Sequence, residues 1–229
     1  MKKITAILLG TLLASSAALA QTNQVLSRNA VGYIKIPLQS NKLYLVSNPF
    51  FSLEAGPMFV SNVFAAVPPG TTISVWNEAN QSYDGYAKST RGAWVGSALT
   101  ATLVRADGIF VQTPATNAPV DLFFMGEVPD RFTSPSNQTT RVPGLTVVGY
   151  PYPVTMRLTN TAIGQQVPPG TVISVWDSAA NTYIGYGKST RGAWVGSALT
   201  AEFNPGQGMV ISATNAANSW YETKPYTWP

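Results

Sequence analysis

The sequence contains no histidine and no cysteine, and only 10% of its residues are charged. Without histidine there is no Ser-His-Asp triad, no imidazole for acid-base chemistry near neutral pH, and no example of the commonest transition-metal ligand. Without cysteine there are no disulfides and no thiolate sites. Most enzyme classes thereby lose their usual groups, and we expect a protein that is not an enzyme and binds no metal or other cofactor.

Charge of either sign is scarce and nearly balanced. The chain has 14 basic and 10 acidic residues, and two of the basic ones are Lys2 and Lys3, so the remainder carries 12 against 10. Nucleic-acid binding needs cations concentrated on one face, so we do not expect nucleic acid as a partner. A surface this neutral is typical of proteins that pack against copies of themselves, glycans or a matrix.

The N-terminus has the three parts of a secretory signal peptide. Lys2 and Lys3 precede an apolar run over 4–13, and the small-residue triplet Ala18-Leu19-Ala20 precedes polar Gln21. The run is shorter than the roughly 20 residues needed to span a bilayer. We therefore predict a signal peptide over 1–20, a polar segment over 21–30, and export to the cell surface or the medium, with the periplasm as an alternative.

Most of the remaining chain is one unit used twice. Residues 67–102 align without a gap on 167–202 with 27 identities in 36 positions, and 88–101 are identical to 188–201. Weaker similarity continues on both sides, which predicts repeats over 31–130 and 131–229. The repeats form either two small domains or two halves of one pseudo-twofold domain.

The local pattern predicts an all-β fold. In 72–76 the alternation places Ile73 and Val75 on one face of a strand and Thr72, Ser74 and Trp76 on the other. Dispersed Gly and Pro favour small β-sandwiches or open barrels, with one short helix per copy at 57–66 and 159–166. Hairpins are predicted over 71–89 and 171–189, and further strands at 31–38, 43–49, 92–96, 108–113, 119–127, 144–150, 192–196, 208–213 and 218–224.

Several motifs resemble a family when they are taken together. They are AVGYIKIPL, LVSNPF, PPGTTISVWN, the Gly92-Ala93-Trp94 step, and DGIFVQTP followed by LFFMGEVP. This succession is similar to that of uncharacterised secreted tandem-repeat β-proteins of environmental Gram-negative bacteria. The resemblance covers most of the chain and implies a secreted repeat protein, but it implies no activity.

The duplicated K-S-T-R-G-A-W-V-G stretch and the tyrosines before it are the candidate binding site. Trp, Tyr, Lys and Arg together can stack on sugar rings and orient their hydroxyls, whereas core packing is the competing interpretation of the tryptophans. The candidate ligand-binding residues are Tyr83, Tyr86, Lys88, Arg91 and Trp94, and in the second copy Tyr183, Tyr186, Lys188, Arg191 and Trp194.

Two catalytic arrangements survive the absence of histidine, and neither is favoured. A glycosidase needs paired carboxylates, for which Glu127 and Asp130 are nearest in sequence, with Asp107 and Asp121 more distant. These residues are more simply interpreted as solvated turn carboxylates. A Ser-Lys dyad at 88–89 or 188–189 is opposed by geometry, because adjacent strand residues point to opposite faces.

The sequence favours an exported non-catalytic surface, structural or adhesive protein. We hypothesise that an edge strand, 31–38 or 218–224, pairs with a neighbouring copy. A bivalent carbohydrate-binding module is the first alternative. A small outer-membrane β-barrel is the second, although its strands would be unusually short and interrupted by proline.

Overall fold

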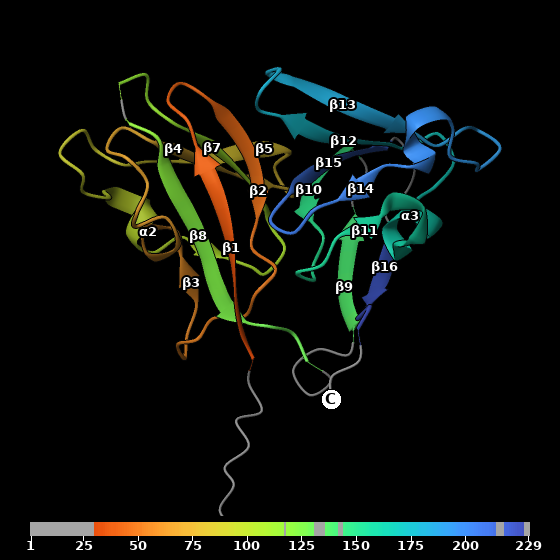
Figure 1. Cartoon of the computed structure of the whole chain (residues 1–229), viewed down its shortest axis with the longest axis horizontal. Coiled ribbons are helices and arrows are strands. Elements are labelled where there is room, and N and C mark those ends of the chain that lie inside the picture. Colours follow the sequence, from red (N-terminus) through yellow and green to blue (C-terminus); the bar gives the residue numbers. More distant parts are fainter. Residues whose placement is uncertain (1–29, 117, 131–135, 142–143, 214–217, 227–229) are drawn as a thin grey trace, which may run out of the picture. The chain divides into compact units, whose positions relative to one another are not determined.

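The computed structural model describes residues 30–116, 118–130, 136–141, 144–213 and 218–226. The predicted signal peptide lies outside these residues, as does nearly all of the polar segment that follows it. From Val31 onward the described chain is all-β, with antiparallel strands and two short α-helices (Figure 1). The predicted fold class is confirmed.

The two repeats have the same order of strands. The elements of the first are β1 (Val31–Leu38), β2 (Leu43–Ser47), β3 (Met58–Phe59), α2 (Val60–Val63), β4 (Thr72–Asn77), β5 (Ser82–Ala87), η1 (Gly96–Leu99), β6 (Thr102–Leu103), β7 (Gly108–Gln112) and β8 (Val120–Glu127). Those of the second are β9 (Ser136–Arg141), β10 (Gly144–Gly149), β11 (Met156–Arg157), η2 (Leu158–Asn160), α3 (Ala162–Gln166), β12 (Val172–Asp177), β13 (Thr182–Gly187), η3 (Gly196–Leu199), β14 (Glu202–Phe203), β15 (Gly208–Ala213) and β16 (Asn218–Thr223).

Each repeat pairs its strands in the same way. A four-stranded sheet has the order β2-β7-β4-β5 in the first repeat and β10-β15-β12-β13 in the second. A two-stranded ribbon, β1-β8 or β9-β16, joins the first and last strands of each repeat, and the short pairs β3-β6 and β11-β14 complete the set. Because every strand of one repeat has a counterpart in the other, the duplication seen in the sequence extends to the topology; among the described residues, only η2 is an additional element of the second repeat.

Most predicted strands are present, including both hairpins, but those at 92–96 and 192–196 are wrong. Residues 92–95 and 192–195 are a bend followed by irregular backbone, in which Trp94 and Trp194 make isolated bridges to Lys88 and Lys188, and Gly96 and Gly196 begin η1 and η3. The cause is the backbone at Gly92, whose φ of 86° cannot continue a strand. Strand β9 was not predicted, because its polar sequence Ser-Asn-Gln-Thr-Thr-Arg lacks the apolar alternation of a half-buried strand.

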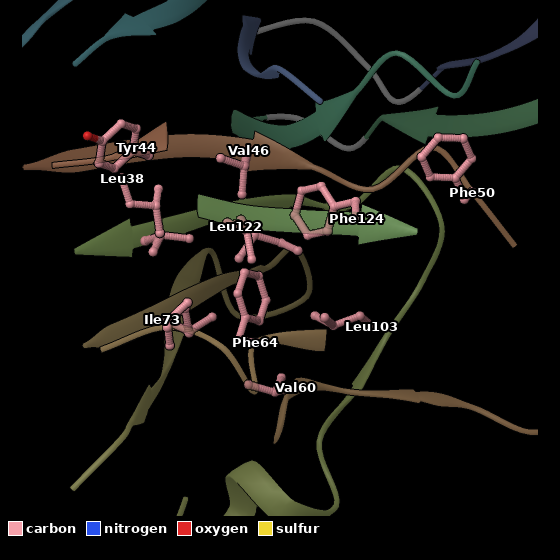
Figure 2. Packing of buried hydrophobic residues seen from close by; sticks show 13 residues of the cluster. Leu38, Tyr44, Val46, Phe50, Val60, Phe64, Ile73, Leu103, Leu122 and Phe124 are labelled. Carbon is pink, nitrogen blue, oxygen red and sulfur yellow. The ribbon is translucent and has the colours of Figure 1, made fainter. Parts of the chain in front are cut away.

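The first repeat encloses a core between its sheet and its ribbon. Side chains from β2, β4 and β7 meet Leu122 and Phe124 of β8, and Phe64 packs edge-to-face on Phe124 with ring centroids 6.0 Å apart (Figure 2). Val60 and Leu103 pack into the same cluster. The second repeat has a separate equivalent core.

Each four-stranded sheet is buried on its other face as well. Ile73 and Val75 of β4 pack on the repeat core, whereas Trp76 packs in a third cluster that draws on both repeats. The predicted division of β4 into two faces is therefore correct. The third cluster also contains Leu45, Phe110 and Val147, with Trp176 packed against it. Burial on both faces explains the uninterrupted apolar runs of β2 and β7.

The contact between the repeats is reciprocal. The indole Nε1 of Trp76 donates to the Leu145 carbonyl at 2.9 Å, and that of Trp176 donates to the Leu43 carbonyl at 2.7 Å. A second pair of equivalent hydrogen bonds runs from Ser47 N to Gly206 O at 2.9 Å and from Gly149 N to Ala106 O at 2.8 Å. Such matched contacts are those of a pseudo-twofold interface.

Close backbone approach at this interface requires glycine. A Cβ at Gly108 would lie 2.7 Å from Val147 Cγ1 and 2.8 Å from the Val148 nitrogen, and one at Gly208 would lie 2.8 Å from Leu45 Cγ. A Cβ added at Gly85, on β5, would have no other atom within 4 Å. The two sheets thus pack so closely at these glycines that a single added methyl group would clash.

We predict that Gly108→Ala destabilises the protein by about 1 to 3 kcal/mol, because the methyl group overpacks against β10. Urea denaturation followed by tryptophan fluorescence measures the effect. The matched control, Gly85→Ala, should be neutral or slightly stabilising, since alanine loses less backbone entropy on folding than glycine. Equal effects of the two substitutions would contradict the packing described here.

Candidate functional site

The ribbon β1-β8 of the first repeat exposes an apolar face. Side chains alternate along both strands, so Leu122 and Phe124 point into the core while their neighbours point outward. The outward residues are Val31, 62% exposed, Tyr33, 70%, and Met125, 63%. Phe123 is 43% exposed, and its ring lies 6.4 Å from that of Tyr33. Adjacent exposed apolar side chains of this kind mark a contact surface.

Few charges interrupt this face. Lys35 and Asp121, from the two strands of the ribbon, form an ion pair with Nζ and Oδ2 2.7 Å apart. Both side chains are exposed, so the pair adds little stability, but each charge neutralises the other. Glu127, at the end of β8, lies opposite Val31 in the strand register.

A groove of about 560 Å³ continues from the ribbon. Phe123 and Met125 line it from β8, and Leu53 and Glu54 line it from the 52–57 segment, with Met58 and Val63 beneath. Leu53 is 56% exposed. We call the ribbon face and this groove together the apolar surface, defined by Val31, Tyr33, Leu53, Phe123 and Met125.

An insertion gives the groove one of its walls. Met58 and Met156 begin the equivalent strands β3 and β11, and Pro49 and Pro151 occupy equivalent positions before them. Met58 comes nine residues after Pro49, whereas Met156 comes only five residues after Pro151. The first repeat therefore has four additional residues in the segment that lines the groove.

Larger side chains fill the corresponding space in the second repeat. Aligning Pro129 with Pro225 places Phe124 against buried Trp220, and buried Gly126 against buried Glu222. The Glu222 carboxylate accepts hydrogen bonds from the backbone N–H groups of Ala162, at 3.1 Å, and Ile163, at 2.7 Å, while burial raises the pKa of this carboxyl. Trp220 and Glu222 line a cavity of only about 10 Å³.

The ribbon of the second repeat is also more polar. Its strand β9 consists of Ser, Asn, Gln, Thr and Arg, and among the side chains described over 219–223 of β16, those of Ser219, Tyr221 and Thr223 are exposed. The two repeats thus have equivalent cores and a shared interface but differ in their ribbons. Among the described residues, the apolar surface is the largest difference between the two repeats.

The structure does not assemble the sequence-predicted binding residues into one platform. Tyr83 lies on the interface face of β5, with its ring centroid 4.6 Å from Trp76 and 5.6 Å from Phe110, and Tyr183 stacks similarly on Trp176 at 4.7 Å. Tyr86 packs on the opposite face, against the repeat core, as does its copy Tyr186. Arg91 and Arg191 are exposed in their turns.

The duplicated lysines are buried, and their ammonium groups donate hydrogen bonds to backbone carbonyls of the same repeat. Lys88 Nζ donates to the carbonyls of Ala65 at 2.7 Å and Val67 at 2.8 Å. Lys188 Nζ donates to three carbonyls, those of Gly164, Gln165 and Val167, at 2.8 to 3.1 Å. Burial lowers the pKa of both ammonium groups. Each buried ammonium group is therefore satisfied by backbone carbonyls of its own repeat, which offsets the cost of its burial.

The duplicated tryptophans pack partly into the repeat cores. Trp94 and Trp194 lie against them, and the Lys88 ammonium is 6.0 Å from the centre of the Trp94 ring. Trp194 Nε1 donates to the Gly164 carbonyl at 2.7 Å. The hydroxyls of Ser89 and Ser189 accept from the N–H groups of Ala93 and Ala193 at 3.1 Å, which closes each turn.

The carboxylates considered for catalysis occupy different surroundings. Asp121 pairs with Lys35 on the ribbon, Glu127 bridges to Phe51 through its backbone, and Asp130 is buried. Asp107 lies at the interface, where it bridges to Val148. No group of three or more acidic residues in the described part of the chain is arranged to hold a metal ion.

Sequence reasoning missed the apolar surface, although a signal was present. The segment 122–125, Leu-Phe-Phe-Met, is apolar at consecutive positions, which predicts a strand buried on both faces. Only Leu122 and Phe124 are buried. A two-stranded ribbon at the outside of its repeat has one core-facing side, so its other apolar side chains remain in solvent.

Compared with models of protein families, with curated proteins and with solved structures, the chain matches none of them. Among the described residues, no helix has the length and apolar character needed to cross a bilayer.

Half-buried Asp107 predicts a pH dependence of stability. Burial raises its pKa to about 6, and the charge of Glu78 adds to this, while a hydrogen bond from Val104 N at 2.7 Å opposes it. The folded protein thus favours the protonated carboxyl, and stability falls as the pH rises through about 4 to 6. We expect a loss on the order of 1 to 2 kcal/mol.

Asp107→Asn should remove this loss and keep the hydrogen bond, just as neutral Gln207 accepts from Asn204 N at 3.1 Å in the second repeat. Relative to the parent protein, the variant should gain free energy of unfolding at pH 8 and change little at pH 4. Urea denaturation at the two pH values measures this. An equal change at both would show that the Asp107 carboxyl does not titrate as described.

Proposed function

We propose that the chain is an exported, non-catalytic surface protein with a structural or adhesive role, and that it associates with copies of itself through the apolar surface of its first repeat. One observation carries the proposal: Val31, Tyr33, Leu53, Phe123 and Met125 are exposed together on one repeat, while the equivalent region of the other is polar or filled. Covering exposed apolar surface with another protein lowers the free energy of the system, because it removes that surface from water.

The backbone of β1 supports the same proposal. Among the described residues β1 pairs with β8 alone, so its other edge has no strand partner. A strand edge beside an apolar face offers a second copy both hydrogen bonds and hydrophobic contact. Of the two edges suggested by the sequence, β1 is the better supported, because its ribbon carries the apolar side chains.

The composition fits a secreted or cell-surface location. The signal-peptide pattern at 1–20 accounts for export, and the low charge of the chain reduces electrostatic repulsion between copies. The proposed partners are therefore a second copy of the chain and, through it, a surface matrix.

A bivalent carbohydrate-binding module is the second candidate. Tyr83 and Tyr183 are 44% and 46% exposed, and they occupy equivalent positions in the two repeats. Each could stack one face of a sugar ring. Glycan binding that is lost in Tyr83→Ala and Tyr183→Ala, without loss of the fold, would favour this function.

Replacing Tyr33 and Met125 by glutamate should abolish self-association. We expect the molecular mass of the parent protein in light scattering to rise with concentration. The mass of the Tyr33→Glu/Met125→Glu variant should stay at that of the monomer, because association would desolvate two charges in the contact. The dissociation constant should increase at least about tenfold.

Tyr221→Glu is the matched control. Tyr221 is 53% exposed and occupies the position equivalent to Met125 in the second repeat, so its replacement should leave association unchanged. Circular dichroism checks that all variants fold. A parent protein that stays monomeric at every concentration would refute the proposed function.

A further inference from the structure

The segment 88–101 and its copy 188–201 carry the same exposed side chains in the two repeats. In the first repeat Arg91, Val95 and Leu99 point into solvent, with Val95 56% and Leu99 53% exposed. Val195 and Leu199 are 55% and 51% exposed in the second repeat, beside exposed Arg191. We call these sets the turn patches. Each combines one cation with two aliphatic side chains.

Folding does not require most of this surface identity. Buried Lys88 and Ala98 and half-buried Trp94 explain why the interior of the stretch is shared. Exposed positions have no such reason to be alike. Of the nine positions between 67 and 87 that are exposed in both copies, five differ, namely 72, 80, 81, 82 and 84. Of the eight between 88 and 101, none differs.

The charges of the turn patches and of the apolar surface are opposite. No acidic residue occurs in 88–101 or 188–201, and the lysine of each stretch is buried, so the arginine sets the charge of each patch. On the apolar surface Lys35 is already paired with Asp121. The charges that remain there are those of exposed Glu54, on the rim of the groove, and of Glu127.

We infer that a turn patch of one copy docks on the apolar surface of the next, with Val95 and Leu99, or Val195 and Leu199, against the groove and the arginine beside Glu54 and Glu127. This deepens the proposed function and rests on it. Among the described residues of the second repeat, Trp220 and Glu222 occupy the place that corresponds to the groove and leave a cavity of only about 10 Å³. A turn patch docked on the groove of the first repeat is therefore a contact between unlike surfaces. Repeated head to tail from copy to copy, such a heterologous contact builds either a closed ring or an open filament.

Charge reversal on each side tests this contact. Arg91→Glu/Arg191→Glu should weaken self-association at least about tenfold, since like charges would face each other, and Glu54→Arg/Glu127→Arg should do the same. Mixing these two variants, or combining all four substitutions in one chain, should restore assembly. Sedimentation velocity over a range of protein and salt concentrations measures the association.

Arg157→Glu is the matched control, because Arg157 is an exposed cation outside both turn patches, and it should assemble like the parent. If the Arg91→Glu/Arg191→Glu variant also assembles like the parent, the turn patches are not the partner surface, and the proposed function stands without this inference. Failure of the mixture to recover would likewise overturn it. A parent protein that never assembles would refute both proposals.

Discussion

The fold depends on the burial of both faces of each four-stranded sheet. Strands β2, β4 and β7 direct alternate side chains into their own repeat and into the cluster shared with the other. A repeat on its own would expose Leu45, Phe110 and the Trp76 indole, whose N–H finds its acceptor in the other repeat. The hydrophobic effect therefore makes the pair of repeats, rather than the single repeat, the stable unit.

This constraint separates what the two repeats must share from what they can change. The interface needs Trp76 and Trp176 in equivalent places, with glycines where the backbones approach closely. The outward faces of the ribbons lie outside this interface, and there the repeats have diverged. A phenylalanine and a glycine in the first repeat correspond to Trp220 and Glu222 in the second, which leaves one groove open and fills the other. Duplication has thus produced one symmetric scaffold with one asymmetric surface.

Much of this fold could be predicted from the sequence, because apolar periodicity and glycine positions are local properties. The period-two pattern around Ile73 identified both hairpins and the two faces of β4 correctly. The same pattern wrongly predicts a strand at 92–96, because the positive φ angles of the glycines there override it. It does not predict β9, because the polar sequence of that strand has no apolar alternation. The candidate site was harder to predict. Whether Phe123 or Phe124 is exposed depends on which side of the ribbon faces the core, and that is a property of the tertiary arrangement.

The duplicated segment 88–101 contains both buried and exposed residues, and the two sets have different explanations. Lys88 looks like a surface cation in the sequence, yet its ammonium is directed at the carbonyls of Ala65 and Val67 inside the repeat. Burying a charge without such partners would cost several kcal/mol, so this lysine is explained by the fold alone. The same stretch carries Arg91, Val95 and Leu99, which the fold leaves in water. The fold explains the buried residues of the segment, whereas the exposed residues are the ones that our proposal assigns to contact with another copy.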